Sequence, residues 1–170
     1  MRILAISGSL QRRSTNTRLL EAARSIASPG VDVVLYRALE QIPHFNPDLT
    51  DPTDGPVAEL RREIAAADAV LIATPEYAHG LPGALKNALD WIVGSGELYS
   101  KRVAALTAAP SKDRGHSARE MLERTLRALG AEVAFSSSVT MSGDDAVDIS
   151  AATRAALDEA LQVLTRSGPT

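Results

Sequence analysis

Residues 2–23, RILAISGSLQRRSTNTRLLEAA, contain three patterns in succession. Residues 2–7 are mostly apolar, which is typical of a buried strand. A polar segment follows, in which Leu10 is the one apolar side chain and hydroxyl groups stand beside Arg12 and Arg13. From Thr17 onward, leucine and alanine recur at helical spacing. The stretch therefore predicts a strand, a loop and a helix, which is how an α/β domain begins.

The alternation of strand and helix patterns continues along the chain. The expected strands cover residues 2–7, 31–36, 69–74, 103–108 and 132–136, and the expected helices cover residues 17–26, 57–66, 82–93, 117–129 and 151–164. Several of these strands are continuous apolar runs, which is typical of parallel strands covered on both faces. We therefore predict an α/β fold of one domain over residues 1–170. It would be a flavodoxin-like three-layer sandwich with a five-stranded parallel sheet in the order 2-1-3-4-5.

The composition excludes several functional classes. The 170 residues include no cysteine, so disulfides, thiolate metal sites and a cysteine nucleophile are ruled out. The net charge of −3 gives no reason to expect binding to nucleic acid or to a membrane surface. No apolar run approaches the roughly 20 residues of a membrane span, and the first one is too short for a signal peptide, so we expect a cytoplasmic protein. Neither the histidines nor the acidic stretch at 143–148 has metal-ligand spacing, so we expect no metal.

The first loop has the composition of a phosphate-binding site. In open α/β sheets, ligands bind beyond the carboxyl ends of the strands, and here a helix N-terminus with its partial positive charge follows the loop. The candidate phosphate contacts are Ser9, Arg12, Arg13, Ser14, Thr15 and Asn16. The glycine-rich nucleotide motifs are absent, so a terminal monophosphate fits better than a pyrophosphate. Serine, threonine and asparagine also cap helices, and simple capping is the alternative interpretation.

The loop after the third expected strand suits a flat ring system. Residues 73–91 are ATPEYAHGLPGALKNALDW, in which Tyr77 and His79 bring planar side chains to the carboxyl edge of the sheet. Gly80 allows a ring to approach closely, and Pro82 suits the first turn of the next helix. A partly apolar surface with accessible backbone amides is what a stacked aromatic ring needs.

These two stretches carry a family resemblance. The segments GSLQRRSTN at 8–16 and TPEYAHGLPGALKNALDW at 74–91 resemble the motifs of the NAD(P)H-dependent FMN reductases, flavodoxin-fold enzymes that include quinone, azo-dye and chromate reductases. Two positions depart from the family pattern. Gln11 stands where an arginine is usual, so that Arg12 or Arg13 has to supply the charge, and Ala78 replaces a usual asparagine.

The resemblance implies a set of site residues. Ser9, Ser14 and Asn16 match the positions that bind the FMN phosphate. Pro75, Glu76 and Tyr77 match residues along the flavin ring, and backbone groups of Glu76, Tyr77, Ala78, His79 and Gly80 would contact its polar edge. Tyr77 and His79 are also possible contacts of the electron acceptor. In the loop at 109–115, Ser111 could bond a ring carbonyl and Lys112 could face the charge of the reduced flavin.

The expected function is an FMN-dependent NAD(P)H oxidoreductase. Its reductant would be NADPH or NADH, and its acceptors quinones, flavins or similar small molecules, reduced in a two-step ping-pong cycle. The resemblance also implies a homodimer or homotetramer with Trp91 near the contact. One alternative is an electron-transfer or flavin-binding protein without its own NAD(P)H activity. Another is a phosphate-binding domain that lacks flavin, because fold alone does not fix function.

Overall fold

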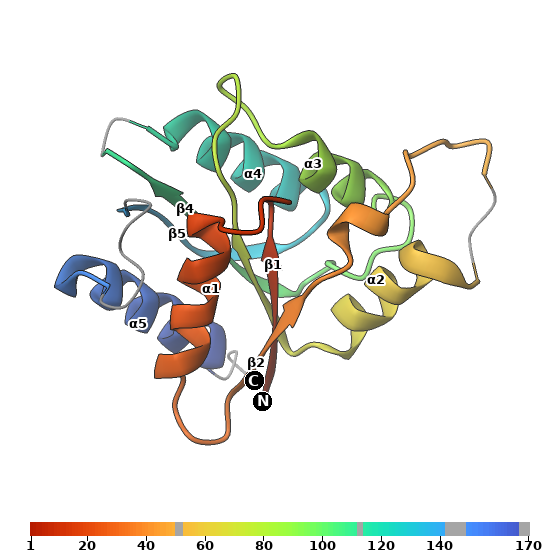
Figure 1. Ribbon diagram of the computed structural model, residues 1–170. Coiled ribbons are helices and arrows are strands. Elements are labelled where there is room, and N and C mark those ends of the chain that lie inside the picture. Colours follow the sequence, from red (N-terminus) through yellow and green to blue (C-terminus); the bar gives the residue numbers. More distant parts are fainter. Residues whose placement is uncertain (50–52, 112–113, 142–148, 167–170) are drawn as a thin grey trace.

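The protein is an α/β sandwich built on one parallel sheet (Figure 1). This computed structural model describes residues 1–49, 53–111, 114–141 and 149–166. Within these residues the strands are β1 (Arg2–Ser7), β2 (Asp32–Tyr36), β3 (Ala69–Ala73), β4 (Arg102–Ala109) and β5 (Glu132–Thr140). The helices are α1 (Thr15–Ile26), α2 (Gly55–Ala66), α3 (Gly83–Asp90), α4 (His116–Ala128) and α5 (Ala151–Thr165), with a 3₁₀ turn, η1, at Leu39–Gln41.

The sheet has the order β2-β1-β3-β4-β5, and every neighbouring pair is parallel, so the predicted fold is confirmed. Because β1 lies between β2 and β3, the direction of strand order reverses there. The carboxyl ends of β1 and β3 meet at this point, with β4 beside β3. Ligands of such sheets bind at this reversal. The loops that follow β1, β3 and β4 lie there.

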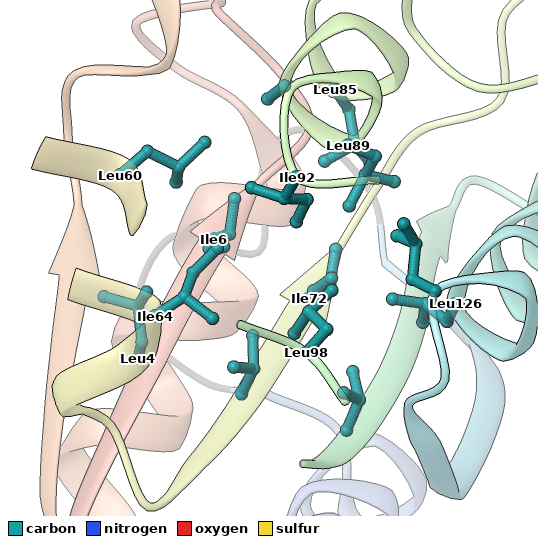
Figure 2. Close-up of a cluster of buried hydrophobic side chains, with 14 of the residues drawn as sticks. Leu4, Ile6, Leu60, Ile64, Ile72, Leu85, Leu89, Ile92, Leu98 and Leu126 are labelled. Atoms are coloured by element: carbon teal, nitrogen blue, oxygen red, sulfur yellow. The ribbon is translucent and has the colours of Figure 1, made fainter. Parts of the chain in front are cut away.

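The two faces of the sheet carry separate cores. Along β1, Leu4 and Ile6 belong to the core under α2, α3 and α4, whereas Ile3 and Ala5 belong to the core under α1 and α5. Figure 2 shows the first core, in which side chains of α2 and α3 and of the loop residue Leu98 meet those of β1 and β3. Each fully buried leucine or isoleucine there contributes about 1.5–3 kcal/mol relative to an exposed one. Continuous apolar strands occur because both faces are covered.

The bounds of two elements differ notably from expectation. β5 continues to Thr140, because residues 136–138, three serines, remain paired with β4 at the edge of the sheet, and Thr107 Oγ1 donates to Ser138 Oγ at 2.9 Å. The third helix was expected over 82–93 but spans Gly83–Asp90, with Pro82 as its N-cap residue. Of the helices in the described residues, none is both long and apolar enough to cross a bilayer.

Candidate functional site

A cleft of about 990 Å³ opens at the carboxyl edge of the sheet, between the loops that follow β1, β3 and β4. Among the described residues its lining consists of Ser9, Gln11, Ser14–Asn16, Pro75–His79, Ala108–Ser111 and Arg114–Ser117. Most of the predicted site residues are therefore brought together, although they come from three separate parts of the chain. Arg12, Arg13 and Gly80 are not part of this lining. Lys112 and the acidic stretch 143–148 lie outside the described residues.

The first loop wraps tightly over the end of β3. The backbone N–H of Gly8 donates to the Ala73 carbonyl at 2.8 Å, so the loop begins as a continuation of the sheet. A Cβ atom on Gly8 would lie 2.5 Å from Oγ1 of Thr74, a separation that real contacts do not reach. Glycine is therefore required here for close approach and not for an unusual backbone angle.

Ser14 both caps α1 and lines the cleft. Its Oγ accepts a hydrogen bond from the Thr17 N–H at 3.4 Å, and its backbone is extended, as an N-cap residue requires. One cap satisfies one of the four unpaired N–H groups of the first helical turn. The start of α1 therefore keeps backbone donors beside the cleft, and the two interpretations of this segment, helix cap and anion site, are compatible.

Asn16 bonds to the opposite wall of the cleft. Its side chain is buried, its Oδ1 accepts from the Ala108 N–H at 2.9 Å, and its Nδ2 donates to the Ala108 carbonyl at 3.4 Å. This pair of bonds joins the start of α1 to the end of β4, 92 residues away. Asn16 thus holds the two walls at a fixed separation, a role that the sequence pattern did not suggest.

The turn after β3 is a strained two-residue reversal. The Tyr77 N–H donates to the Gly80 carbonyl at 3.0 Å, and the Gly80 N–H donates to the Tyr77 carbonyl at 2.9 Å. Between them, Ala78 and His79 have φ angles of 47° and 60°. Two successive left-handed residues define a type I′ turn, which usually contains asparagine and glycine. The left-handed backbone of this turn therefore falls on Ala78 and His79, which have side chains, and not on Gly80.

Glu76 connects this turn to α4. Its side chain is largely buried, its Oε2 accepts from the Ala118 N–H at 3.1 Å, and its Oε1 lies 3.6 Å from His79 Nδ1. The N-cap residue of α4, Gly115, has no side chain to cap the helix. A carboxylate near a helix N-terminus is stabilising, so Glu76 caps α4 from a distance. Lys86 Nζ contacts Asp90 Oδ1 at 2.6 Å, four residues further along α3.

The basic side chains at the cleft differ from those expected. Arg12 lines a smaller neighbouring hollow, and Arg13 is exposed, whereas Arg114 and His116 line the cleft itself. His116 contacts Glu120 Oε1 at 3.2 Å and an Arg119 nitrogen at 3.1 Å. The sequence analysis included the loop after β4 in the site. Nothing in the composition of that loop identified Arg114 or His116 as residues of the cleft. Within the described residues, no group of three or more His, Asp or Glu could hold a metal.

The sequence model of one protein family, described as NADPH-dependent FMN reductase, matches residues 1–146. The chain belongs to this family. The family assignment made from the two motifs is therefore confirmed, and those motifs provide the first and second loops of the cleft.

Comparison with individual proteins gives further likenesses. A probable NADPH:quinone oxidoreductase of Oryza sativa is 40% identical over 115 residues, which covers 64% of this chain and 56% of that protein. An NAD(P)H-dependent FMN reductase of Pseudomonas aeruginosa is 39% identical over 111 residues, covering 64% of this chain and 60% of the relative. The matched part thus spans little more than half of each relative. FerB of Paracoccus denitrificans, a flavoenzyme NAD(P)H:(acceptor) oxidoreductase, superposes with a TM-score of 0.74 over 96% of both chains, at 25% identity.

Proposed function

We propose that this protein is an FMN-dependent NAD(P)H oxidoreductase that reduces quinones, flavins or similar small acceptors. The observation that carries the proposal is the cleft, which joins a helix N-terminus with hydroxyl side chains to a wall formed by the 75–79 segment. Its volume of about 990 Å³ lies at the upper end of pockets that enclose small molecules, so it has room for a flavin and a second ring above it.

The residues at the α1 end fit the phosphate of FMN. Ser9 and Thr15 bring hydroxyl groups to the cleft beside the amides of the first turn of α1. Backbone N–H groups and the helix dipole both favour an anion at such a position. Arg114, from the loop before α4, would add positive charge across the cleft, beside His116 at the first position of α4. Asn16 would act by fixing the separation of the walls, and its second amide hydrogen remains a possible donor.

The 75–79 segment fits the flavin ring. Pro75, Glu76 and Tyr77 line one wall, and the bonds of the Tyr77–Gly80 turn keep its shape rigid. Ala78 and His79 would present backbone groups to the polar edge of the ring, as would Ser111 from the loop after β4. Tyr77 and His79 are exposed, so they lie where an electron acceptor would arrive.

Bound FMN would supply the redox chemistry, accepting a hydride from NADPH or NADH and passing the electrons to the acceptor. The contribution of the protein is binding, orientation and electrostatic tuning. Because donor and acceptor would use the same open cleft in turn, the kinetics would be ping-pong. We further propose a cytoplasmic location, where NAD(P)H is available.

We also propose a homodimer or homotetramer. Trp91, expected at the contact, is 4% exposed and packs inside the subunit, where its Nε1 donates to the Pro43 carbonyl at 2.8 Å. Phe45, whose ring meets that of Trp91, and Val93 and Tyr99, which follow Trp91 in the chain, are exposed and would provide the contact instead. Light scattering of the protein as it elutes from a size-exclusion column would give its molar mass in solution. A monomer at micromolar concentration would refute the proposed dimer or tetramer.

The test of the cofactor is a matched pair of charge insertions. Thr15 and Ala151 both follow a serine N-cap whose Oγ accepts from an amide three positions along, so Thr15→Asp and Ala151→Asp place the same carboxylate at equivalent positions of α1 and α5. Acidic residues are favourable in a first helical turn, so both variants should fold. Calorimetric titration with FMN should show strong binding for the parent and Ala151→Asp, and a loss of at least tenfold for Thr15→Asp.

The test of the activity uses the FMN-loaded protein. Oxidation of NADPH or NADH with a simple quinone should be rapid and should give parallel double-reciprocal plots. A protein that binds FMN but oxidises neither nucleotide would be an electron-transfer protein, the main alternative. A protein that binds no FMN would refute the proposal.

A further inference from the structure

The segment 76–81, which includes the turn beside the cleft, contacts α4 at both of its ends. At the first end, the Ala118 N–H donates to Glu76 Oε2 at 3.1 Å. At the second end, the Leu81 N–H donates to Met121 Sδ at 3.5 Å. Residues three apart in a helix lie on the same face, so both contacts come from one face of α4. The position of this segment therefore depends on α4.

The thioether of Met121 also lies beside Gly80. A Cβ atom on Gly80 would be 3.6 Å from Sδ and 3.8 Å from Cε of Met121, which is ordinary van der Waals separation. The sulfur thus packs next to the two residues that follow the left-handed pair Ala78 and His79. A thioether is flexible, apolar and only a weak hydrogen-bond acceptor, and it suits such an irregular gap. The packing here depends on those properties.

Met121 differs from the other methionines of the chain in its accessibility and position. Met141 is 3% exposed, and Met1, at 41% exposed, precedes β1 at the opposite edge of the sheet from the cleft. The side chain of Met121 is partly exposed. It therefore combines access for a small reagent with direct contact to the segment that lines the cleft.

We propose that Met121 is an oxidation site, at which hydrogen peroxide converts the thioether to the sulfoxide and thereby weakens FMN binding. In this step the sulfur attacks one peroxide oxygen and the O–O bond breaks. An S–O bond forms, and the second oxygen leaves as water with both hydrogens. Methionine sulfoxide reductases reverse the product to the thioether. The effect on FMN rests on the proposed function, whereas the modification itself does not.

The sulfoxide changes the contacts between α4 and the turn. It carries a strongly polar oxygen where the thioether was apolar. Because Sδ already lies against Leu81 N and beside Gly80, the new oxygen cannot be added with both contacts unchanged. We expect the affinity for FMN to fall by about five- to tenfold, as for the loss of one or two ordinary hydrogen bonds. The thermal midpoint of the FMN-free protein should fall by about 2–4 °C.

The test compares the parent with Met121→Leu, which keeps nearly the same apolar volume and retains Met1 and Met141. Both proteins are treated with dilute hydrogen peroxide, and the peroxide is then removed. Peptide mass spectrometry of the parent should show one added oxygen on Met121, while Met141 remains unchanged. FMN release on dilution, followed by flavin fluorescence, should show weaker binding in the treated parent and unchanged binding in treated Met121→Leu. Incubation with methionine sulfoxide reductases should restore the parent.

Three results would overturn the proposal. The first is a parent in which Met1 is oxidised and Met121 stays a thioether. The second is a parent with the sulfoxide at position 121 that keeps its FMN affinity and its thermal midpoint. The third is a treated Met121→Leu that loses as much as the parent. Failure of the proposed function is seen separately, because a protein that binds no FMN would still show the sulfoxide and the lower midpoint.

Discussion

Replacement of Asn16 by alanine separates a structural role from a cofactor contact. The Asn16 side chain is 3% exposed, and it is the partner of the Ala108 N–H and of the Ala108 carbonyl. Ala108 is itself buried, so alanine at position 16 leaves its N–H without a partner. That loss costs about 1–3 kcal/mol, and the longer second bond adds a smaller amount. We therefore expect the free energy of unfolding of the FMN-free protein to fall by about 2–3 kcal/mol.

Urea unfolding of the FMN-free protein, followed by circular dichroism, measures this change. With an m-value of about 1–3 kcal/mol/M, the midpoint should move down by roughly 0.7–3 M. Thr15→Ala is the comparison, because Thr15 lines the same cleft and, among the described residues, its Oγ1 has one long contact, at 3.4 Å from an Arg18 nitrogen. It should lower FMN affinity while changing unfolding by less than about 0.5 kcal/mol. If Asn16→Ala has the stability of the parent and loses only FMN affinity, the argument from the Ala108 bonds is wrong.

Three further predictions concern the backbone near the site and one buried phenol. Gly8→Ala should destabilise the protein by about 1–3 kcal/mol in urea, because the new Cβ meets Thr74, and Thr74→Ala in the same chain should recover part of the loss. Ala78→Asn should raise the thermal midpoint by about 1–4 °C, because asparagine tolerates the φ of 47° better than alanine; an unchanged or lower midpoint would argue against strain in this turn. Burial, with nearby Glu59 and Glu63, raises the pKa of Tyr36 to about 12. The folded protein then keeps this proton between pH 10 and 12 while the unfolded chain loses it, so about 2–3 kcal/mol of stability present below pH 10 should disappear by pH 12. Tyr36→Phe should remove that part of the pH dependence, and an identical pH profile in the variant would contradict the assignment.

The fold could be predicted because its strands are covered on both faces. A run such as residues 69–73, AVLIA, is apolar throughout, and each such run is followed by a helical pattern. The end of β5 was missed because serines at an edge strand resemble a loop. Their strand conformation depends on pairing with β4, which no local pattern records. The early end of α3 has the same kind of cause, since tertiary contacts decide where a helix end is stabilised.

The sequence predicted which loops form the site, but it did not predict where their side chains point. Topology places the three loops together once the strand order is known, and the motifs identified two of them. Whether a loop arginine faces one cavity or its neighbour depends on the path of the chain between them, as Arg12 shows. The partners of Asn16 and Glu76 lie 92 and 42 residues away, so their bonds follow only from the folded chain.

The burial of Trp91 makes it a built-in optical reporter. It is the single tryptophan of the chain, and the ring of Phe45 meets it edge-on at 5.2 Å between centroids. Its indole also depends on the Pro43 carbonyl for a partner. Its emission should therefore shift to longer wavelength when residues 43–45 lift away from α3, even while the sheet remains intact. Stopped-flow emission records could time that local opening without any attached dye.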